Sequence, residues 1–167
     1  SHALEYCAAD YAIAQLADSL GDKARSEEFK KRAVSYRRYY CKEHGTLRPL
    51  TKDGEFLGDF DPATGKNFEN VPGFHEASAW CYTFAVPHDI EGLTELMGGK
   101  KEFINKLQAV FDDGHYDPAN EPDIVYPYLF SRIKGEEWRT QKEVKNILDN
   151  HYKNAPDGIP GNDDTGT

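Results

Sequence analysis

The chain has 167 residues and a formal net charge of −9, from 29 acidic and 20 basic residues. This length suits one domain, and 38% hydrophobic with 29% charged residues is typical of a folded chain rather than a disordered one. The acidic balance argues against a nucleic-acid-binding protein, whose affinity would come mainly from phosphate contacts, and no apolar run approaches the roughly 18 residues of a membrane span.

The first 41 residues predict a helical hairpin, because apolar residues recur at helical spacing. Gly21 is a plausible stop for the first helix, and Asp22 or Ser26 a plausible start for the second. The two expected apolar stripes consist of Leu4, Ala8, Tyr11, Ala12, Leu16 and Leu20, and of Phe29, Ala33, Tyr36 and Tyr40.

A long loop rich in Gly, Asp, Pro and Asn is expected from residue 42 to residue 73. Its length of roughly 30 residues is far above the usual range, which indicates a functional loop or one packed over another part of the protein. Residues 53–61 lack the regular ligand spacing of an EF-hand and predict turns or a short hairpin.

Helices are expected next at residues 76–84, 89–97 and 100–112. Pro87 would stop the first of them, and Asp89 would cap the second. After a polar loop at residues 113–123, the pattern predicts another helical pair at residues 124–133 and 140–152.

The order of these elements predicts an all-α fold, since strands do not alternate with helices and no glycine-rich nucleotide loop is present. Helix pairs joined by alternately short and long loops favour part of an α/α toroid over a compact bundle. Such barrels gather their active-site residues on the loops at one end.

Three polar clusters could carry chemistry: His75-Glu76, residues 120–123 and residues 161–164. Glycoside hydrolysis needs two carboxyl groups, one to protonate the leaving oxygen and one to activate water or attack the sugar. Calcium needs several oxygen ligands, which Asn, Asp and Glu provide. Each cluster also has a structural explanation, as a first-turn carboxylate, a helix cap and a turn, respectively.

Taken in order, several segments resemble one known family. The run Phe74 to Asp89, FHEASAWCYTFAVPHD, resembles the signature of glycoside hydrolase family 92, and the continuation IEGLTELMGG is similar as well. Further matches are Gly114-His115-Tyr116, Asn120-Glu121-Pro122, Trp138-Arg139-Thr140-Gln141, Pro156-Asp157-Gly158 and Gly161-Asn162-Asp163-Asp164, so the resemblance spans essentially all 167 residues.

The resemblance implies an exo-acting bacterial α-mannosidase that inverts configuration and uses calcium. Its members pair a β-sandwich domain with an (α/α)6 barrel, and the site lies between them. Residues 1–167 would then be part of an (α/α)6 catalytic barrel, made of helical hairpins with long functional loops. The N-terminal β-sandwich domain and the remaining barrel helices would belong to the parent protein, and we expect the chain alone to be inactive.

The resemblance also implies roles for individual residues. Glu76 matches the general acid and Asp164 the general base. Glu121 matches a contact to the terminal mannose or its calcium, and Asn120 stands where relatives vary with linkage preference. The expected substrate contacts are His75, Trp80, Asn120, Glu121 and Asn162, and the expected calcium ligands are Asn120, Glu121 and Asp164.

The sequence departs from the family pattern at three places. Ala77-Ser78 replaces the usual Gly-Asn beside the expected acid, and Cys81 stands where Gln is common. The ending Thr165-Gly166-Thr167 also differs from the usual continuation. Substrate contacts next to Glu76 and beyond Asp164 are therefore expected to differ from those of relatives.

The expected partner is a mannose-containing glycan, met by a parent protein in the periplasm, at the cell surface or outside a bacterium, in N-glycan degradation. A barrel cut open would expose apolar helix faces, which favours association with the missing domains or with itself. Two alternatives stand beside this reading: a non-catalytic carbohydrate-binding or scaffold module of the same fold, and another α/α-barrel glycosidase. The joint presence of Glu76, Glu121 and Asp164 favours the enzyme.

Overall fold

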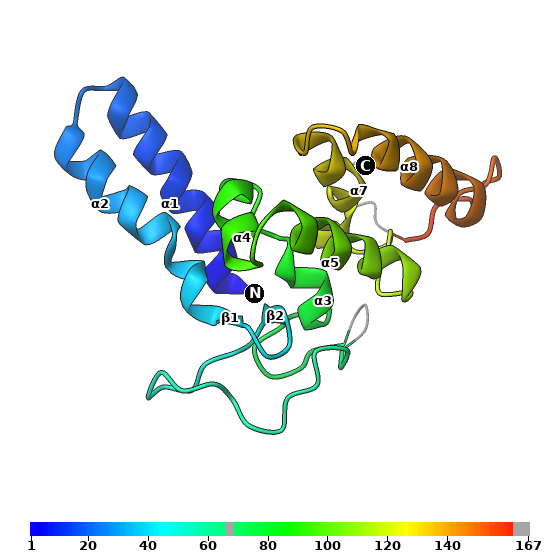
Figure 1. The fold of residues 1–167 in the computed structure, drawn as a ribbon, viewed down its shortest axis with the longest axis horizontal. Helices are drawn as coiled ribbons and strands as arrows, with labels where there is room; N and C mark the ends of the chain where they lie inside the picture. Colours follow the sequence, from blue (N-terminus) through cyan, green and yellow to red (C-terminus); the bar gives the residue numbers. More distant parts are fainter. Residues whose placement is uncertain (66–68, 162–167) are drawn as a thin grey trace.

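The computed structural model describes residues 1–65 and 69–161, and most of the fold is helical (Figure 1). The chain forms an N-terminal hairpin, a central group of helices and a C-terminal group, in that order. The only sheet in these two ranges is a pair of two-residue strands. The expectation of an all-α fold is therefore confirmed. Among the described helices, none is both long and apolar enough to cross a bilayer.

The N-terminal hairpin consists of α1 (His2–Ser19) and α2 (Lys23–Ala33), which lie side by side in Figure 1. Gly21 makes the turn with a φ of 77°, a conformation that favours glycine. Asp22 caps α2, since its Oδ1 accepts a hydrogen bond from the Arg25 N–H at 3.0 Å. The predicted stop and start of the two helices are confirmed.

The prediction that the apolar stripe of α1 is buried is wrong for the C-terminal half of the helix. Leu16 and Leu20 are 60% and 75% exposed, while Cys7, Ala14 and Ala17 face inward. Small residues let two helices approach closely, so the contact with α2 selects the alanine face rather than the leucine face. The inward side of α1 also carries Asp10, which pairs with Arg32 of α2 at 3.0 Å.

The second helix ends at Ala33 rather than continuing to Tyr40. A 3-10 turn, η1 (Ser35–Tyr39), follows and leads into β1 (Tyr40–Cys41), which pairs antiparallel with β2 (Thr46–Leu47). Tyr36 is fully buried, and its hydroxyl donates to Asp89 Oδ2 at 2.8 Å. This contact is made from the 3-10 turn. The turns predicted around residues 53–61 are also present: the Gly54 N–H donates to the Thr51 carbonyl at 3.0 Å, and an antiparallel bridge joins Leu50 to Phe56.

The central group contains α3 (Ala79–Thr83), α4 (Ile90–Leu96) and α5 (Lys100–Asp112). The prediction that a helix starts at residue 76 is wrong, because Ser78 caps α3 and accepts from the Cys81 N–H at 3.5 Å. The prediction for α4 is confirmed, with Asp89 accepting from the Gly92 N–H at 2.9 Å.

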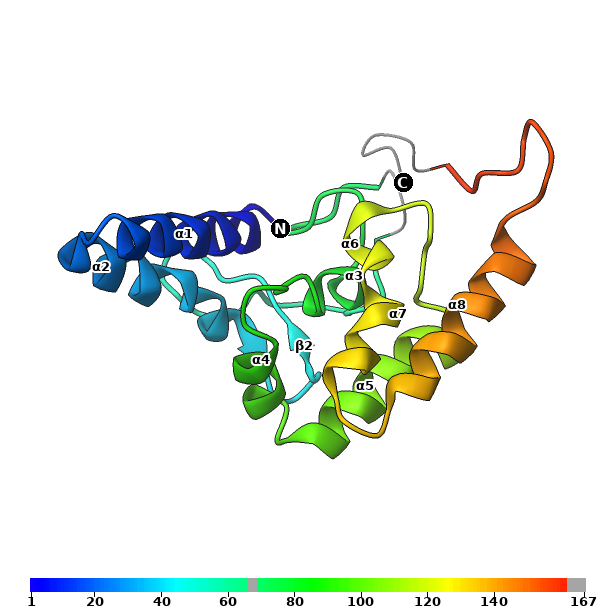
Figure 2. The same ribbon diagram turned by 90° about the horizontal axis from the view of Figure 1, so that it is seen from above.

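The C-terminal group contains α6 (Glu121–Ile124), α7 (Tyr126–Leu129), η2 (Phe130–Arg132) and α8 (Glu137–His151). The helix expected at residues 124–133 is therefore divided into short pieces, and α8 begins three residues earlier than predicted. In Figure 2 these pieces descend from α6 through α7 and turn back along α8.

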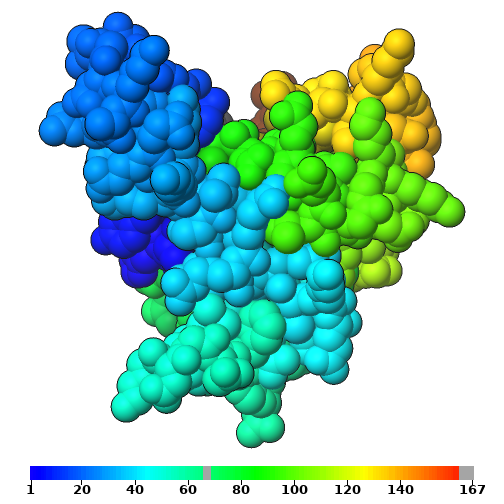
Figure 3. Space-filling model, turned by 60° about the vertical axis from the view of Figure 1, so that its left-hand side comes forward, coloured from blue at the N-terminus to red at the C-terminus, as the bar shows by residue number. Residues whose placement is uncertain are grey.

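An aromatic core joins the central and C-terminal groups. The ring centre of Phe84 lies 5.4 Å from that of Phe103 and 5.5 Å from that of Tyr126, and all three residues are fully buried. Edge-on contacts of this kind add to the free energy gained by burying the rings. In the space-filling view of Figure 3, the α1–α2 hairpin and the long loop after β2 project away from this body.

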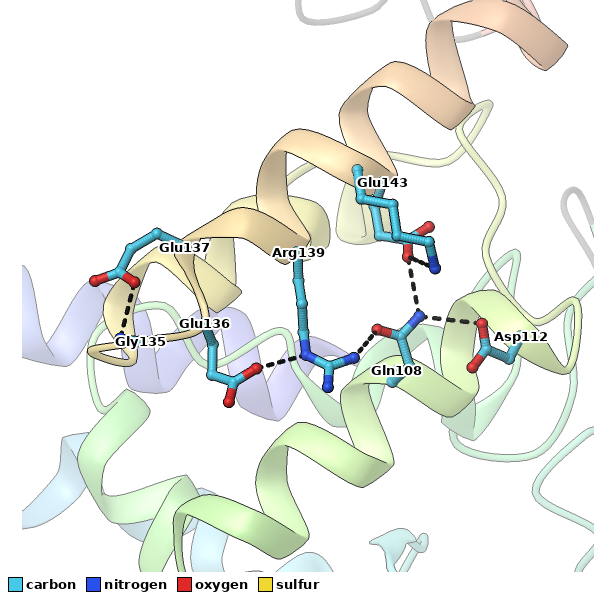
Figure 4. Close-up of polar contacts among 8 residues, drawn as sticks. Gln108, Asp112, Gly135, Glu136, Glu137, Arg139 and Glu143 are labelled. Carbon is cyan, nitrogen blue, oxygen red and sulfur yellow. Dashed lines mark hydrogen bonds and ion pairs between the residues drawn. The ribbon is translucent and has the colours of Figure 1, made fainter.

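A polar network fastens α8 to α5 (Figure 4). Gln108 donates from Nε2 to Glu143 Oε1 at 3.0 Å and to Asp112 Oδ1 at 3.1 Å, and its Oε1 accepts from Arg139 at 2.7 Å. Glu143 is only 2% exposed and also pairs with Lys142 at 3.1 Å. Gln108 is the one side chain in this set that bonds to both Glu143 and Arg139.

Replacing Gln108 by leucine should lower the free energy of unfolding by about 1–3 kcal/mol, because the buried carboxylate of Glu143 loses a donor and Arg139 loses an acceptor. Denaturant titration followed by helical circular dichroism measures this change. Gln15→Leu is the matched control on exposed α1, and a change within about 0.5 kcal/mol is expected there. Equal losses in both variants would contradict a structural role for the network.

Candidate active site

A pocket of about 440 Å³ brings together the first two polar clusters of the sequence. The N-terminal end of α1, the segment before α3, α3 itself and α6 contribute lining residues. Figure 2 shows the start of α1, α3 and α6 in the same part of the fold. The lining residues are Leu4, Glu5, Ala8, His75, Glu76, Tyr82, Ala85, Pro87, Asn120, Glu121 and Pro122.

Glu76 occupies a strained position at the edge of this pocket. Its φ is 60°, and among the described residues only Asp59 shares a positive φ without being glycine. That conformation costs a non-glycine residue on the order of 1–2 kcal/mol, and such strain is concentrated at functional sites. A right-handed helix cannot contain it, which explains why α3 begins only after Ser78. The Glu76 side chain is 39% exposed, with Oε1 3.5 Å from His75 Nε2.

Side chains from three places hold the backbone around Glu76. The Tyr82 hydroxyl donates to the carbonyl of His75 at 2.7 Å, and the Glu76 N–H donates to Asn70 Oδ1 at 3.1 Å. Asn120 Nδ2 donates to the carbonyl of Glu76 at 2.8 Å. The two sequence clusters are thus joined directly, through a bond that spans 44 residues of chain.

Asn120 and Glu121 reach the pocket from the start of α6. Asn120 is 3% exposed and is the N-cap residue, and Pro122 occupies the first turn, where a missing N–H costs nothing. The preceding turn is closed by the Asn120 N–H, which donates to the Asp117 carbonyl at 3.1 Å. Glu121 is half-buried and lines the pocket beside Glu76.

Asp123 supports this segment from within the core. It is fully buried, and its Oδ2 accepts from the Asp117 N–H at 2.8 Å, while Oδ1 has no hydrogen-bond partner among the described residues. Burial raises the pKa of Asp123 well above its usual range, and burial together with Asp123 raises the pKa of the Cys81 thiol to about 12. Both groups therefore keep their protons to a higher pH than the same groups do in water.

Trp80 does not line the pocket that contains Glu76. One face of its indole stacks on His115, with ring centres 4.2 Å apart and an interplanar angle of 11°, and Lys106 Nζ lies 3.7 Å from the indole centre. Both groups therefore pack against the indole ring. Trp80 instead borders a second pocket of about 400 Å³ next to Lys106.

The predicted residues Asn162 and Asp164 lie outside the described residues, as does the rest of the segment 162–167. The structure therefore brings together His75, Glu76, Asn120 and Glu121 from the predicted set.

Two groups of side chains could be considered for a metal ion. In the pocket, the carboxylates of Glu76 and Glu121 and the amide oxygen of Asn120 are oxygen donors, which suit a hard cation such as calcium. At the β1–β2 turn, the ligand atoms of Cys41, Glu43 and His44 lie within 4.8 Å of one another. There the cationic Arg48 Nη1 lies 3.5 Å from His44 Nε2, which disfavours a metal ion at that nitrogen.

Sequence reasoning missed Tyr82, Asn70 and Glu5. Tyr82 lies within the recognised signature, six residues after Glu76, so its position on α3 could have pointed to it. Asn70 belongs to the long loop and Glu5 to α1, and no local pattern relates either to Glu76. Only the tertiary fold brings them to the pocket.

Comparison with known proteins identifies relatives along the whole chain. The family model described as the glycosyl hydrolase family 92 catalytic domain matches residues 1–167. A family 92 α-mannosidase of Bacteroides thetaiotaomicron, solved in complex with mannoimidazole, is 31% identical, with a TM-score of 0.84 over 96% of this chain and 23% of its own. A family 92 inverting mannosidase of the same species is 30% identical, with a TM-score of 0.83 over 98% of this chain and 25% of its own.

A protein of the fungus Arthroderma benhamiae, described as an uncharacterized secreted glycosidase, is 25% identical over 185 residues, which are 99% of this chain and 24% of that protein. The chain thus spans about a quarter of the length of the relatives that it matches.

Asp123→Asn should make the protein more stable at neutral pH. Because folded Asp123 keeps its proton above about pH 4, where the unfolded side chain loses it, the folded state binds more protons and stability falls as the pH rises through this range. Asparagine imitates the protonated acid at every pH. We expect equal stability near pH 4 and a gain of about 1–3 kcal/mol near pH 7, measured by denaturant titration.

The matched control for this prediction is Asp157→Asn, at an exposed position. It should leave the difference in stability between the two pH values as it is in the wild type. An Asp123→Asn protein that is less stable than the wild type at pH 7 would show that the buried carboxyl is ionised and paired.

Proposed function

Because this chain belongs to the catalytic domain of glycosyl hydrolase family 92, we propose that the protein containing it is an exo-acting α-mannosidase that releases terminal α-linked mannose from glycans. The observation that carries the proposal is the family match along all 167 residues, with Glu76 held in a strained conformation at a polar pocket. The mannosidase titles of two similar solved structures support mannose as the sugar.

In this proposal Glu76 is the general acid. A partly exposed carboxyl at a pocket edge can receive a proton from water and give it to the departing glycosidic oxygen. Asp164 would act as the general base from the other side of the sugar ring. An inverting enzyme keeps the two carboxyl groups roughly 6.5–9.5 Å apart, so that a water molecule fits between the base and the sugar. The relative named as an inverting mannosidase supports this outcome.

Asn120 and Glu121, with Asp164, would hold the calcium ion. The Asn120 amide nitrogen donates to Glu76, so the amide oxygen is the atom that could bind a cation. Asn120 and Glu121 offer oxygen atoms, which are the ligands that calcium prefers. When bound, the ion would supply positive charge that attracts hydroxyl groups of the terminal mannose. His75 and Glu121 line the same pocket and would contact that sugar, with Asn162 as a further contact.

The parent protein would complete the site. The outward side of α1 exposes Tyr6, Leu16 and Leu20 by 60% or more, which is a wide apolar surface for one helix. We infer that further barrel helices and a β-sandwich domain of the parent cover such surfaces and close the pocket. A secreted fungal relative favours an extracellular protein.

Glu76→Gln in the intact protein should lower kcat on α-mannobioses by about 10²- to 10⁴-fold, because the amide cannot donate a proton to the sugar leaving group. The loss should be much smaller with an α-mannoside of an acidic phenol, whose oxygen departs without protonation. Mannose release, followed by chromatography, measures both rates. Removing calcium with a chelator should also abolish release from the wild type.

Glu91→Gln on α4 is the matched control, because Glu91 lines a different pocket and should leave the rate unchanged. If the folded protein binds mannosides but releases no mannose under any condition, the enzyme proposal is wrong and a carbohydrate-binding module is the better interpretation. An equal loss of kcat on the mannobioses and on the phenyl mannoside would show that Glu76 is not the general acid.

A further inference from the structure

The backbone of Glu76 is held by side chains on both of its flanking peptide groups. The peptide between His75 and Glu76 is bonded at its carbonyl by Tyr82 and at its N–H by Asn70. The next peptide, between Glu76 and Ala77, is bonded at its carbonyl by Asn120. All three distances lie between 2.7 and 3.1 Å.

The orientation of these two peptide planes defines φ and ψ of Glu76. Rotating φ back to the ordinary negative range would turn one plane relative to the other and break at least one of the three bonds. A glutamate has no preference of its own for a φ of 60°, so the surrounding structure must enforce it. The three hydrogen bonds with Tyr82, Asn70 and Asn120 can enforce this conformation.

The holding side chains are themselves fixed. Asn120 is 3% exposed at the start of α6, and Tyr82 is 8% exposed and stacks on Phe74 with ring centres 5.6 Å apart. Burial raises the pKa of Tyr82 to about 12, so its hydroxyl remains a donor at any ordinary pH. Asn70 is exposed and approaches from the long loop.

We propose that Asn120, Tyr82 and Asn70 are positioning residues that hold Glu76 in the left-handed conformation and thereby aim its carboxyl group into the pocket. The inference rests on the proposed role of Glu76 as the general acid. It gives Asn120 a task beyond contact with sugar or calcium, since its amide nitrogen serves the Glu76 backbone.

Asparagine can be replaced by aspartate at both positions, where its side chain has opposite hydrogen-bonding roles. Asn70 accepts a hydrogen bond, and an aspartate in its place keeps an accepting oxygen. Asn120 donates one, and an ionised aspartate there loses the donor and faces a carbonyl instead. Both changes add a negative charge near Glu76, so a general effect of charge would appear in both variants. Of the two aspartate variants, the proposal predicts a lower kcat in Asn120→Asp only.

In the intact protein, Asn120→Asp should lower kcat on α-mannobioses by about 10- to 100-fold, since a small misplacement of a catalytic group has effects of this size. The calcium concentration for half-maximal rate should not rise, because the variant keeps an oxygen for the cation and adds a negative charge. Asn70→Asp should retain kcat within about twofold. Tyr82→Phe keeps the ring packing, and we expect a loss of about threefold or more in kcat.

Crystal structures of the wild type and the variants provide the readout that does not depend on activity. We expect a φ near 60° in the wild type and Asn70→Asp, and a negative φ at Glu76 in Asn120→Asp. A wild type without mannosidase activity would overturn the proposed function, while φ would still decide on the positioning residues. An unchanged φ in Asn120→Asp, or equal losses of kcat in both aspartate variants, would overturn the inference. Should Asn120→Asp not fold, an unchanged kcat and φ in Tyr82→Phe would overturn it.

Discussion

The hydrogen bond from Asn120 Nδ2 to the carbonyl of Glu76 is the interaction on which the pocket depends. It joins the segment before α3 to the start of α6. Glu76 cannot be part of α3 because of its positive φ, and α6 is only four residues long. Neither element is stable on its own, so each needs the other to place its side chains.

The packing beneath the pocket makes that bond possible. Asp123 is buried, its pKa is raised by that burial, and its carboxyl group closes the turn from Asp117 that presents Asn120. The hydroxyl of fully buried Tyr126 donates to the carbonyl of Cys81, which ties the C-terminal group to α3. Further out, the polar network around Gln108 fastens α8 to α5. The contacts from Asp123 and Tyr126 thus connect the core to the segment that contains Glu76.

The sequence predicts the parts of this fold that depend on local rules. Asp22 and Asp89 act as the expected helix caps, and the helix at residues 100–112 appears with the expected bounds. The family signature also selected Glu76, Asn120 and Glu121, which the fold gathers into one pocket. The prediction failed where tertiary contacts override periodicity. Tyr36 is buried as expected, but in a 3-10 turn after the end of α2, and on α1 alanines rather than leucines face the partner helix. The conformation of Glu76 could not be predicted, because it depends on Asn70, Tyr82 and Asn120 together.

We infer that the backbone conformation of Glu76 sets the direction of its carboxyl group in this chain of the family 92 catalytic domain. A crystal structure of the intact protein with calcium and a non-hydrolysable α-mannoside tests this most directly. We predict that the Glu76 carboxyl lies about 2.6–3.2 Å from the atom in place of the glycosidic oxygen, with φ still positive. A mannoside bound with a different carboxyl group at that atom, or bound outside the pocket of Glu76 and Glu121, would contradict the account.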